Sequence, residues 1–513
     1  MSDNTPIIIG VGEASERIDA PDYRAMSPAE LSAAACAAAL EDAHAKAPLA
    51  PLVDVMAAIR QFEISGARAV APFGKADNLP RAVAKRIGAD PKRAILEPVG
   101  GQGPQHLVNE FAHAIANGEM QLALIFGAEA ISTVRHLATK GEKRDWSETV
   151  GGQLEDRGYG VEKLIAPELN AHGAVTPMVF YAMFENARRA KKGMTRETYA
   201  RDEMGKLFAP FTQVAAENPH AMSQEKFSAE DLATVTPKNR LVADPFPRRM
   251  VARDQANQGA AVLLTSVGKA RELGVPEDRW VYLHGGADTT ERSPLERNDI
   301  SGYPAAGLAA RRALEVAGIK TSDLGAFDLY SCFPIAVTDV RDELGIPEND
   351  PRALTVTGGL PFFGGAGNNY SMHAIASMIR LLRSKPGTYG FVGANGGFLS
   401  KYSTGVYSTK PRAWHPFSSK DLQAEIDAWP APASATDSEN SGTVETYTID
   451  YGREQPRGIL VVRTPSGARF AAMTDPEDGA IVQQMIAKEP LGAAVETRRD
   501  DKGRRVVTSF TPK

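Results

Sequence analysis

Two stretches of this chain repeat one pattern, and the repeat limits the fold more than any other feature. Residues 95–130 form an apolar run, a glycine-rich turn, an amphipathic helical pattern and a second apolar run. Residues 357–397 again show a glycine turn, a helical pattern and an apolar run. A solenoid needs three or more short units, so two long copies predict two similar lobes that face each other.

Strand and helix patterns alternate before the first copy. The apolar runs at 6–11 and 53–59 predict buried strands. Residues 27–43 predict a helix with Ser27 as its cap, and residues 79–87 predict another. This alternation predicts a parallel sheet covered by helices on both faces, an α/β fold.

The alternation stops after residue 130. Helical patterns at 176–191 and 195–209 follow, and a buried strand returns at 257–264. A long insertion between strands is usually functional, so we expect a lid or binding loop over about 131–250.

Composition excludes several classes of protein. The chain has 513 residues, a net charge of −5 and two cysteines, Cys36 and Cys332. This predicts about three domains, no disulfide framework and a cytoplasmic setting. No secretion signal, membrane span, P-loop, dinucleotide fingerprint or metal-binding spacing is found, so neither a metal nor a bound cofactor is expected.

The order of elements, the strand NQGAAVLL at 257–264 and the two glycine turns resemble the thiolase superfamily over about residues 7–410. The resemblance implies a duplicated βαβαβαββ unit in a five-layer αβαβα sandwich, with a loop domain inserted in the first half. It also implies CoA or acyl-CoA thioesters as ligands.

Four motifs of that superfamily can be placed on the segments GGQG, YSCF, GGA and ANG, and each lacks its reactive side chain. Gly100 takes the place of the nucleophilic cysteine, and Tyr330 takes the place of the Asn or His. Gly365 takes the place of the catalytic histidine, and Ala394 takes the place of the acid/base cysteine. Acyl transfer in this superfamily depends on a thiolate activated by a histidine. We therefore expect little or no conventional thiolase (acetyl-CoA acetyltransferase) activity.

Main-chain groups remain even where side chains are lost. The resemblance implies an oxyanion hole from the N–H groups of Gly100 and Gly396, and a pocket for acyl-CoA whose backbone includes Gly364. We therefore expect that a variant with Gly100→Cys and Gly365→His can be acylated by an acyl-CoA but cannot complete carbon–carbon bond formation. If Gly100 instead has a positive φ, the cysteine variant should fail to fold, and the glycine is structural rather than the empty place of a nucleophile.

Two side chains near these motifs could still support chemistry. Cys332 could replace the nucleophile, and Tyr330 could donate a hydrogen bond to a bound carbonyl; simple packing is the alternative for each. If active, the protein would be an acyl-CoA acyltransferase of fatty-acid or lipid metabolism with an altered mechanism. His106 and His373 are interpreted as non-catalytic.

The C-terminal region predicts a separate domain. Five short strands and one helix after residue 442 suit a small barrel of the oligonucleotide/oligosaccharide-binding (OB) type. Thiolases proper lack it, and the closest resemblance is to bacterial thiolase-like proteins of type 1. The barrel could make the protein a scaffold, but nucleic acid is not expected, because the basic residues of 498–505 lie in one turn beside Asp500 and Asp501.

The expected division of the chain follows from these patterns. It has a first half (1–275), a second half (276–415), a linker (416–442) and the barrel (443–513). Whether the protein is a homodimer or a monomer is left open, since an added domain could block the sheet edge through which thiolases pair.

Overall fold

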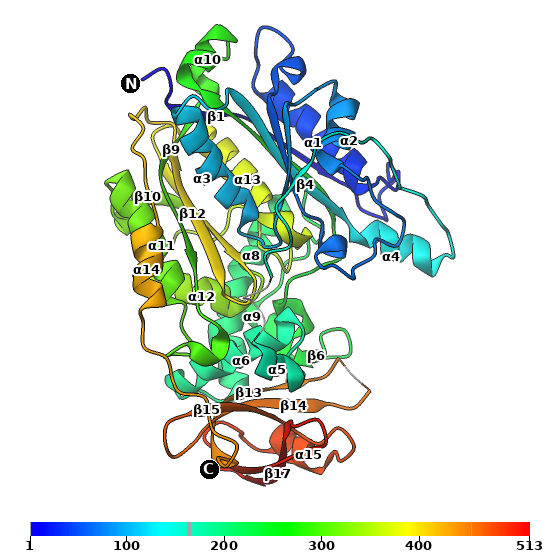
Figure 1. Ribbon diagram of the computed structural model, residues 1–513, viewed down its shortest axis with the longest axis vertical. Helices are drawn as coiled ribbons and strands as arrows, with labels where there is room; N and C mark the ends of the chain where they lie inside the picture. Colours follow the sequence, from blue (N-terminus) through cyan, green and yellow to red (C-terminus); the bar gives the residue numbers. More distant parts are fainter. Residues whose placement is uncertain (1, 162–165, 453) are drawn as a thin grey trace.

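The computed structural model describes residues 2–161, 166–452 and 454–513 (Figure 1). Most of the strands form one sheet in the order β10-β11-β12-β9-β1-β8-β4-β2-β3-β5. The strands of its first half are β1 (Pro6–Ser15), β2 (Val55–Ile59), β3 (Arg93–Glu97), β4 (Leu122–Ala130) and β8 (Asn257–Ser266). The helices of this half are α1 (Pro28–Asp42), α2 (Leu79–Ile87), α3 (Gly103–Ala116) and α4 (Ile131–Thr139).

Local sequence explains where these elements begin. The Ser27 side chain accepts from Glu30 N while the Glu30 carboxylate accepts from Ser27 N, which completes the expected capping box of α1. The first half thus has the βαβαβαββ order that the sequence predicted.

The second half follows the same order with one difference. Its elements are β9 (Val281–Thr290), α11 (Pro304–Ala317), β10 (Leu324–Leu329), α12 (Pro334–Glu343), α13 (Tyr370–Ser384), β11 (Tyr389–Gly396) and β12 (Lys401–Ser408), preceded by α10 (Val267–Glu272). At the place of the third strand, the buried Asp328 carboxylate accepts from Val356 N and from the Thr355 hydroxyl. Together with a single main-chain bond, from Leu329 N to Leu354 O (2.9 Å), these bonds hold the segment beside β10, and the described part of this half has four strands where five were expected.

The two halves meet around two central helices. α3 and α13 lie side by side between the strands of the halves (Figure 1), and α1 and α11 cover outer faces. The sheets join where β1 pairs with β9 through Ile7↔Tyr282 and Ile8↔Val281. This is the predicted thiolase fold of two facing lobes.

The edge of the first half is covered by its own chain. The two-residue strand β5 (Glu155–Asp156) pairs in parallel with Ile95 and Leu96 of β3. Two further bonds extend this contact, from Arg157 N to Leu96 O (3.1 Å) and from Val99 N to Tyr159 O (2.9 Å). The segment 155–159 therefore occupies backbone groups of β3 that a second chain would need for strand pairing.

The insertion is mostly helical. It contains α5 (Pro167–Ala171), α6 (Pro177–Lys192), α7 (Arg196–Tyr199), a π-helix (Ala200–Gly205), α8 (Lys206–Glu217), α9 (Ala229–Ala233), β6 (Leu241–Ala243) and β7 (Phe246–Pro247). The helix expected at 176–191 is present. The one expected at 195–209 continues through the π-helix to Glu217.

The predicted barrel is present and closed. β13 (Ser441–Asp450) pairs with both β14 (Arg457–Arg463) and β16 (Ala494–Arg499), and β15 (Arg469–Met473) and β17 (Arg505–Thr511) complete the ring. Helix α15 (Ala480–Ala487) lies between β15 and β16. Another helix, α14 (Lys420–Asp427), lies in the range expected to be a linker.

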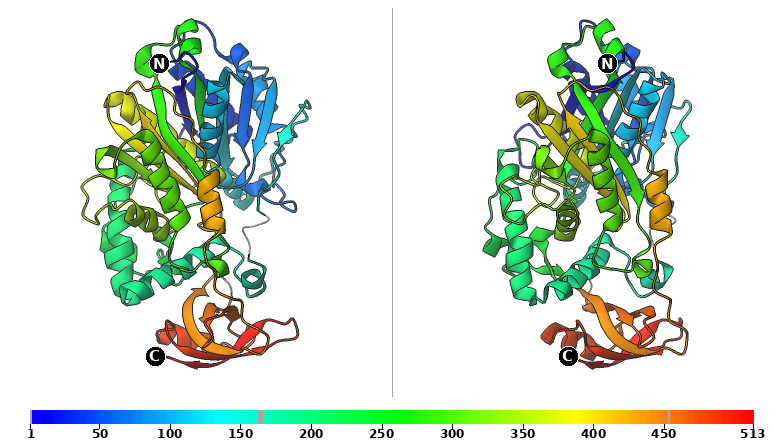
Figure 2. Two further views of the ribbon diagram at one scale, coloured as in Figure 1. Left: turned by 60° about the vertical axis from the view of Figure 1, so that its left-hand side comes forward. Right: turned by 90° about the vertical axis from the view of Figure 1, so that its left-hand side faces the viewer.

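The barrel is packed against the insertion, at the end of the molecule opposite the N-terminus (Figure 2). Ile459 and Val461 of β14 and Ala471 of β15 are buried in the hydrophobic core that continues into the insertion. Ala243 of β6 also pairs with Asp450 of β13. The outer face of β14 and β15 is therefore covered by the chain itself.

None of the helices in the described ranges is long and apolar enough to cross a membrane.

Candidate functional site

A cavity of about 410 Å³ lies where the two halves and the insertion meet. Its walls are mostly apolar, and no histidine occurs among the described residues that line it. The lining consists of Phe62, Val99, Gly100, Gly101, Ile131, Val161, Thr176, Pro177, Met178, Tyr181, Val251, Ala252, Asp254, Tyr330, Cys332, Phe333, Leu360, Gly365, Gly367, Asn368, Asn395, Gly396, Gly397 and Phe398.

Most residues singled out in the sequence meet in this cavity. Gly100, Tyr330, Cys332, Gly365 and Gly396 all line it, although they come from four separate segments. Two others do not. Gly364 lies outside the lining, and Ala394 is fully buried while its neighbour Asn395 faces the cavity.

Gly100 differs from an empty nucleophile position. Its φ is +144°, a conformation that side chains rarely adopt. A Cβ at this position would lie 2.0 Å from Oε1 of Gln102, and a Cβ at Gly396 would lie 1.8 Å from the same atom. The Gln102 amide fills the notch between the two glycines, so Gly100 is structural and the interpretation of it as an empty cysteine site needs correction.

The expected oxyanion hole is also not free. Gly100 N donates to Oδ1 of Asn368, over 3.1 Å. A main-chain N–H that already has an acceptor cannot bind a thioester carbonyl at the same time. In this conformation the pair of Gly100 and Gly396 amides is therefore not an open hole.

Gly365, at the place of the histidine, has an ordinary backbone. Its amide donates to Arg253 O (2.7 Å). A Cβ would have Arg253 O at 3.2 Å as its nearest neighbour, so a side chain fits with small adjustments. The two glycine positions are thus physically different.

Tyr330 offers a phenol to the cavity. Its hydroxyl has no hydrogen-bond partner among the described residues, and the side chain lines the cavity. Burial raises the Tyr330 pKa, and the neighbouring Cys332 adds to this. The group is a neutral phenol at physiological pH, able to donate to a ligand oxygen.

Cys332 is a poor nucleophile. Burial raises its pKa to about 12, although contacts with Tyr181 and Asn395 oppose that effect. Its sulfur lies 3.8 Å from Nδ2 of Asn395. No imidazole lines the described cavity to accept the thiol proton.

Tyr181 of α6 is a cavity residue that the sequence did not single out. Its hydroxyl donates to Gly397 O (3.1 Å) and accepts from Nδ2 of Asn395 (2.7 Å), and its ring stacks on Phe333 at 4.3 Å. The only available signal was a tyrosine on the predicted apolar face of the helix 176–191. That signal does not distinguish a pocket residue from a core residue.

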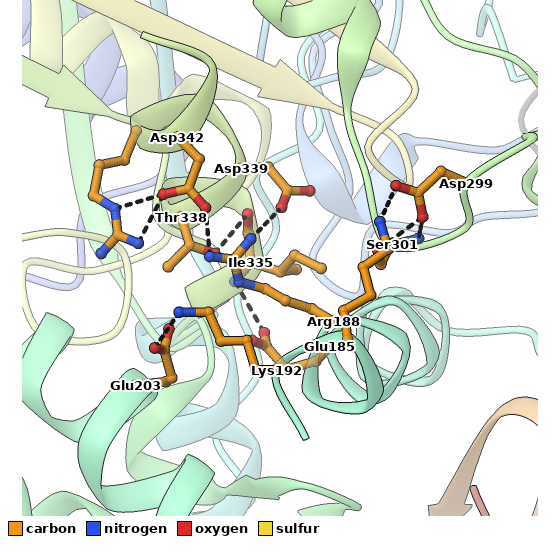
Figure 3. A network of polar contacts seen from close by, with 12 residues as sticks. Glu185, Arg188, Lys192, Glu203, Asp299, Ser301, Ile335, Thr338, Asp339 and Asp342 are labelled. Atoms are coloured by element: carbon orange, nitrogen blue, oxygen red, sulfur yellow. Dashed lines mark hydrogen bonds and ion pairs between the residues drawn. The ribbon is translucent and has the colours of Figure 1, made fainter. Parts of the chain in front are cut away.

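Four residues further along α6, Glu185 fixes the start of α12 (Figure 3). Its carboxylate accepts from Ile335 N (2.9 Å) and from the Tyr199 hydroxyl (2.6 Å). Burial raises the Glu185 pKa to about 7 against these bonds. Since α12 follows the YSCF segment directly, this contact helps to position Tyr330 and Cys332.

Helix α6 also contacts α12 and the barrel. Arg188 pairs with Asp339 (3.3 Å) and Asp342 (2.5 Å) of α12 (Figure 3). Arg189, which is 1% exposed, donates twice to Glu489 of the barrel region, over 2.7 and 2.9 Å. One helix thus contacts the cavity, the second half and the barrel.

The histidines noted in the sequence lie elsewhere. His106 contacts Asp288 (3.2 Å) in a surface groove, and His373 is buried against Glu13 (2.6 Å). Neither lines the cavity. Within the described residues, no group of three or more His, Cys, Asp or Glu side chains could hold a metal ion.

The basic turn of the barrel is neutralised locally. Arg498 pairs with Asp475 (3.0 Å), Arg499 with Asp437, and Arg504 with Asp500 (2.7 Å). This pairing agrees with the solvated hairpin tip that the sequence favours.

The duplicated fold and the cavity at the junction of its halves define a protein of the thiolase superfamily. The chain belongs to the family of SCP2-thiolase-like proteins of type 1. It is 43% identical to the crystal structure of a monomeric member from Mycobacterium smegmatis, with 99% of each chain covered and a TM-score of 0.85. A family model described as the additional C-terminal domain of thiolase-like protein type 1 matches residues 421–502.

More distant relatives carry enzyme names. A steroid side-chain-cleaving aldolase of Thermomonospora curvata is 25% identical over 301 residues, 55% of this chain and 71% of that protein. An acetyl-CoA acetyltransferase of Methanothermobacter thermautotrophicus is 28% identical over 182 residues, 35% of this chain and 44% of that enzyme. The dimeric peroxisomal thiolase of Saccharomyces cerevisiae shares the fold, with a TM-score of 0.57 and 14% identity over 80% of this chain and 98% of that one.

Proposed function

We propose that this protein binds CoA and its acyl thioesters in the cavity between its halves and has no conventional thiolase activity. One observation carries the proposal: both glycine turns and the YSCF segment line a single cavity of about 410 Å³. That volume is within the usual range for small-molecule sites, and mostly apolar walls with a few polar groups suit an acyl or pantetheine chain. Membership of a thiolase-like family supports the same ligand class.

The missing activity follows from the chemistry of the lining. Thiolysis and Claisen condensation pass through an acylated nucleophile, which needs a thiolate and a base. With a pKa of about 12, Cys332 is a thiolate in roughly one molecule in 10⁵ at pH 7. The same argument weighs against an acyltransferase that uses Cys332, and the raised pKa of Tyr330 makes that residue a proton donor rather than a nucleophile.

A second candidate is aldol-type cleavage of a carbon–carbon bond in a 3-hydroxyacyl thioester. It is favoured by the unpartnered phenol of Tyr330 in the cavity and by the name of the Thermomonospora curvata relative. In such a step the Tyr330 phenol would give its proton to the carbanion that forms as the carbon–carbon bond breaks, and its oxygen would take the proton of the substrate hydroxyl, so that a carbonyl compound and a shortened thioester are released and Tyr330 is restored. Release of an aldehyde or ketone by the wild type, and not by Tyr330→Phe, would favour this candidate.

A scaffold that acts through the barrel is less well supported. OB barrels use the face of their second and third strands for ligands. Here that face, β14 and β15, is buried against the insertion.

Calorimetry with CoA and acetoacetyl-CoA, together with a thiolysis assay, tests the first proposal. We expect binding of both ligands and no turnover. Gly365→Met should narrow the cavity and weaken binding of both ligands, because a side chain at this position fits and lies on the cavity wall. Gly479→Met, at an open position of the barrel region, is the matched control. Thiolysis by the wild type, or unchanged binding in Gly365→Met, would contradict the proposal.

A further inference from the structure

Asn368 has an unusual place in the cavity wall. It lies in the glycine turn of the second half and lines the cavity, yet it is only 5% exposed. Each end of its amide has a partner. Oδ1 accepts from Gly100 N (3.1 Å), and Nδ2 donates to Arg60 O (2.8 Å) and to Oγ of Ser65 (3.1 Å).

These partners fix the orientation of the amide. An N–H must face the oxygen and a carbonyl must face the nitrogen, so the assignment of Oδ1 and Nδ2 cannot be exchanged. The amide oxygen of Asn368 is therefore bound to the main-chain N–H of Gly100, a cavity residue at the turn before α3. A carbonyl of a ligand would seek the same kind of donor at a glycine turn next to a helix N-terminus.

On the side of Gly100 that faces Gly396, no room remains for a ligand carbonyl. The notch beside Gly100 is filled by Gln102, whose Oε1 is itself buried without a partner. Tyr330 still offers its hydroxyl, but a carbonyl bound there alone lacks the second donor. Free CoA ends in a thiol and has no carbonyl, so it requires neither the Gly100 N–H nor the Tyr330 hydroxyl.

We propose that Asn368 is an internal ligand of the cavity, whose amide oxygen takes the place of a ligand carbonyl, so that the folded protein prefers CoA with a free thiol to an acyl thioester. This inference rests on the proposed CoA-binding function and adds the residue that sets the choice of ligand. An acyl thioester can bind its carbonyl to Gly100 only after Asn368 swings away.

The Asn368 side chain also contacts a short turn beside the cavity. Arg60 and Ser65 flank the short 3₁₀ turn Phe62–Ile64, and the Phe62 side chain lines the cavity and is 49% exposed. Asn368 thus ties this turn to the second half. Release of its oxygen from Gly100 also loosens its hold on the turn beside the cavity.

Calorimetry with CoA and acetyl-CoA tests the proposal in three proteins. The wild type should bind CoA at least as tightly as acetyl-CoA. In Asn368→Ala the affinity for acetyl-CoA relative to CoA should rise about tenfold, the effect of freeing one hydrogen-bond donor. Ser65→Ala removes a contact of Nδ2 but leaves Oδ1 on Gly100, so it should keep the wild-type ratio.

A second measurement covers the case in which Asn368→Ala does not fold. The carbonyl ¹³C signal of labelled acetyl-CoA is measured on Tyr330→Phe, which removes the other donor, and should stay near its free position because the Gly100 N–H is occupied by Asn368. A clear downfield shift in Tyr330→Phe, or an unchanged affinity ratio in a folded Asn368→Ala variant, overturns the inference. If the wild type binds neither CoA nor acetyl-CoA, the proposed function itself fails, and that result is distinct from both.

Discussion

Replacing Gly100 by cysteine should destabilise the protein, whereas replacing Gly365 by histidine should leave its stability nearly unchanged. At Gly100 a side chain must adopt φ +144°, which costs about 1–3 kcal/mol. Its Cβ would also lie 2.0 Å from Gln102 Oε1. That atom is the end of a flexible side chain, so its displacement adds less than the backbone conformation does. The expected loss for Gly100→Cys is therefore about 1–3 kcal/mol, a sizeable part of the stability of a typical domain.

Gly365→His should be nearly neutral. Its φ is ordinary and its closest contact is 3.2 Å, so we expect a change within about 1 kcal/mol. Urea unfolding followed by tryptophan fluorescence compares the two variants. Adding Gln102→Ala to Gly100→Cys should recover the stability lost to the contact with Gln102. The loss due to the positive φ of residue 100 should remain.

Equal stability of the two variants would refute this reasoning. Of the two positions, Gly100 has a positive φ and a close contact with the Gln102 side chain, and Gly365 has neither. The consequence for chemistry is direct. A variant that carries both replacements is expected to lose stability without gaining an acylated cysteine, which mass spectrometry after incubation with acetyl-CoA can check.

Four further predictions follow from single contacts. Native protein should resist iodoacetamide at pH 7.5 at both cysteines, because burial raises the pKa of Cys36 and of Cys332; rapid labelling of either would contradict this. Burial raises the pKa of Glu129 to about 8 against the bond from Phe62 N, so its contribution to stability is full below about pH 4.5 and is lost as the pH rises through 8. Glu129→Gln should therefore flatten a decline of at most about 1.4 kcal/mol per pH unit in urea titrations, and an equally steep decline would count against it. Arg189→Met should weaken the attachment of the barrel by about 2 kcal/mol, seen as faster proteolysis between the insertion and the barrel, and unchanged cleavage would show that the Glu489 contact is not needed. Glu155→Pro should free the edge of β3 and cause self-association in light scattering, whereas an unchanged mass would show that this edge needs no cover.

Local sequence signals were enough for most of the fold. The cap at Ser27 marked the start of α1, and the five strands and one helix expected after residue 442 are present apart from a small shift of the first strand, because alternation and turn residues are local. The missing strand of the second half and the two-residue β5 were not predicted. At the place of the first, side-chain bonds of Asp328 hold the segment, and the second has no apolar pattern.

The site could be predicted only in part. The motifs brought Gly100, Gly365 and Tyr330 to one cavity, but not the contacts that decide what these positions do. The bond from Gly100 to Asn368 joins residues 268 apart, and the role of Tyr181 depends on a contact with Asn395, 214 residues away. No local pattern carries such information, since it arises when the two halves close on each other.

The strand segment 155–159 along β3 has a consequence for how ligand binding should look in solution. If the covered edge keeps this chain monomeric, one cavity has no neighbouring subunit through which it could affect another. Occupancy should then follow a simple hyperbola with a Hill coefficient of one. The midpoint should not move when the protein is diluted, in contrast to a receptor whose sites are linked across a subunit boundary.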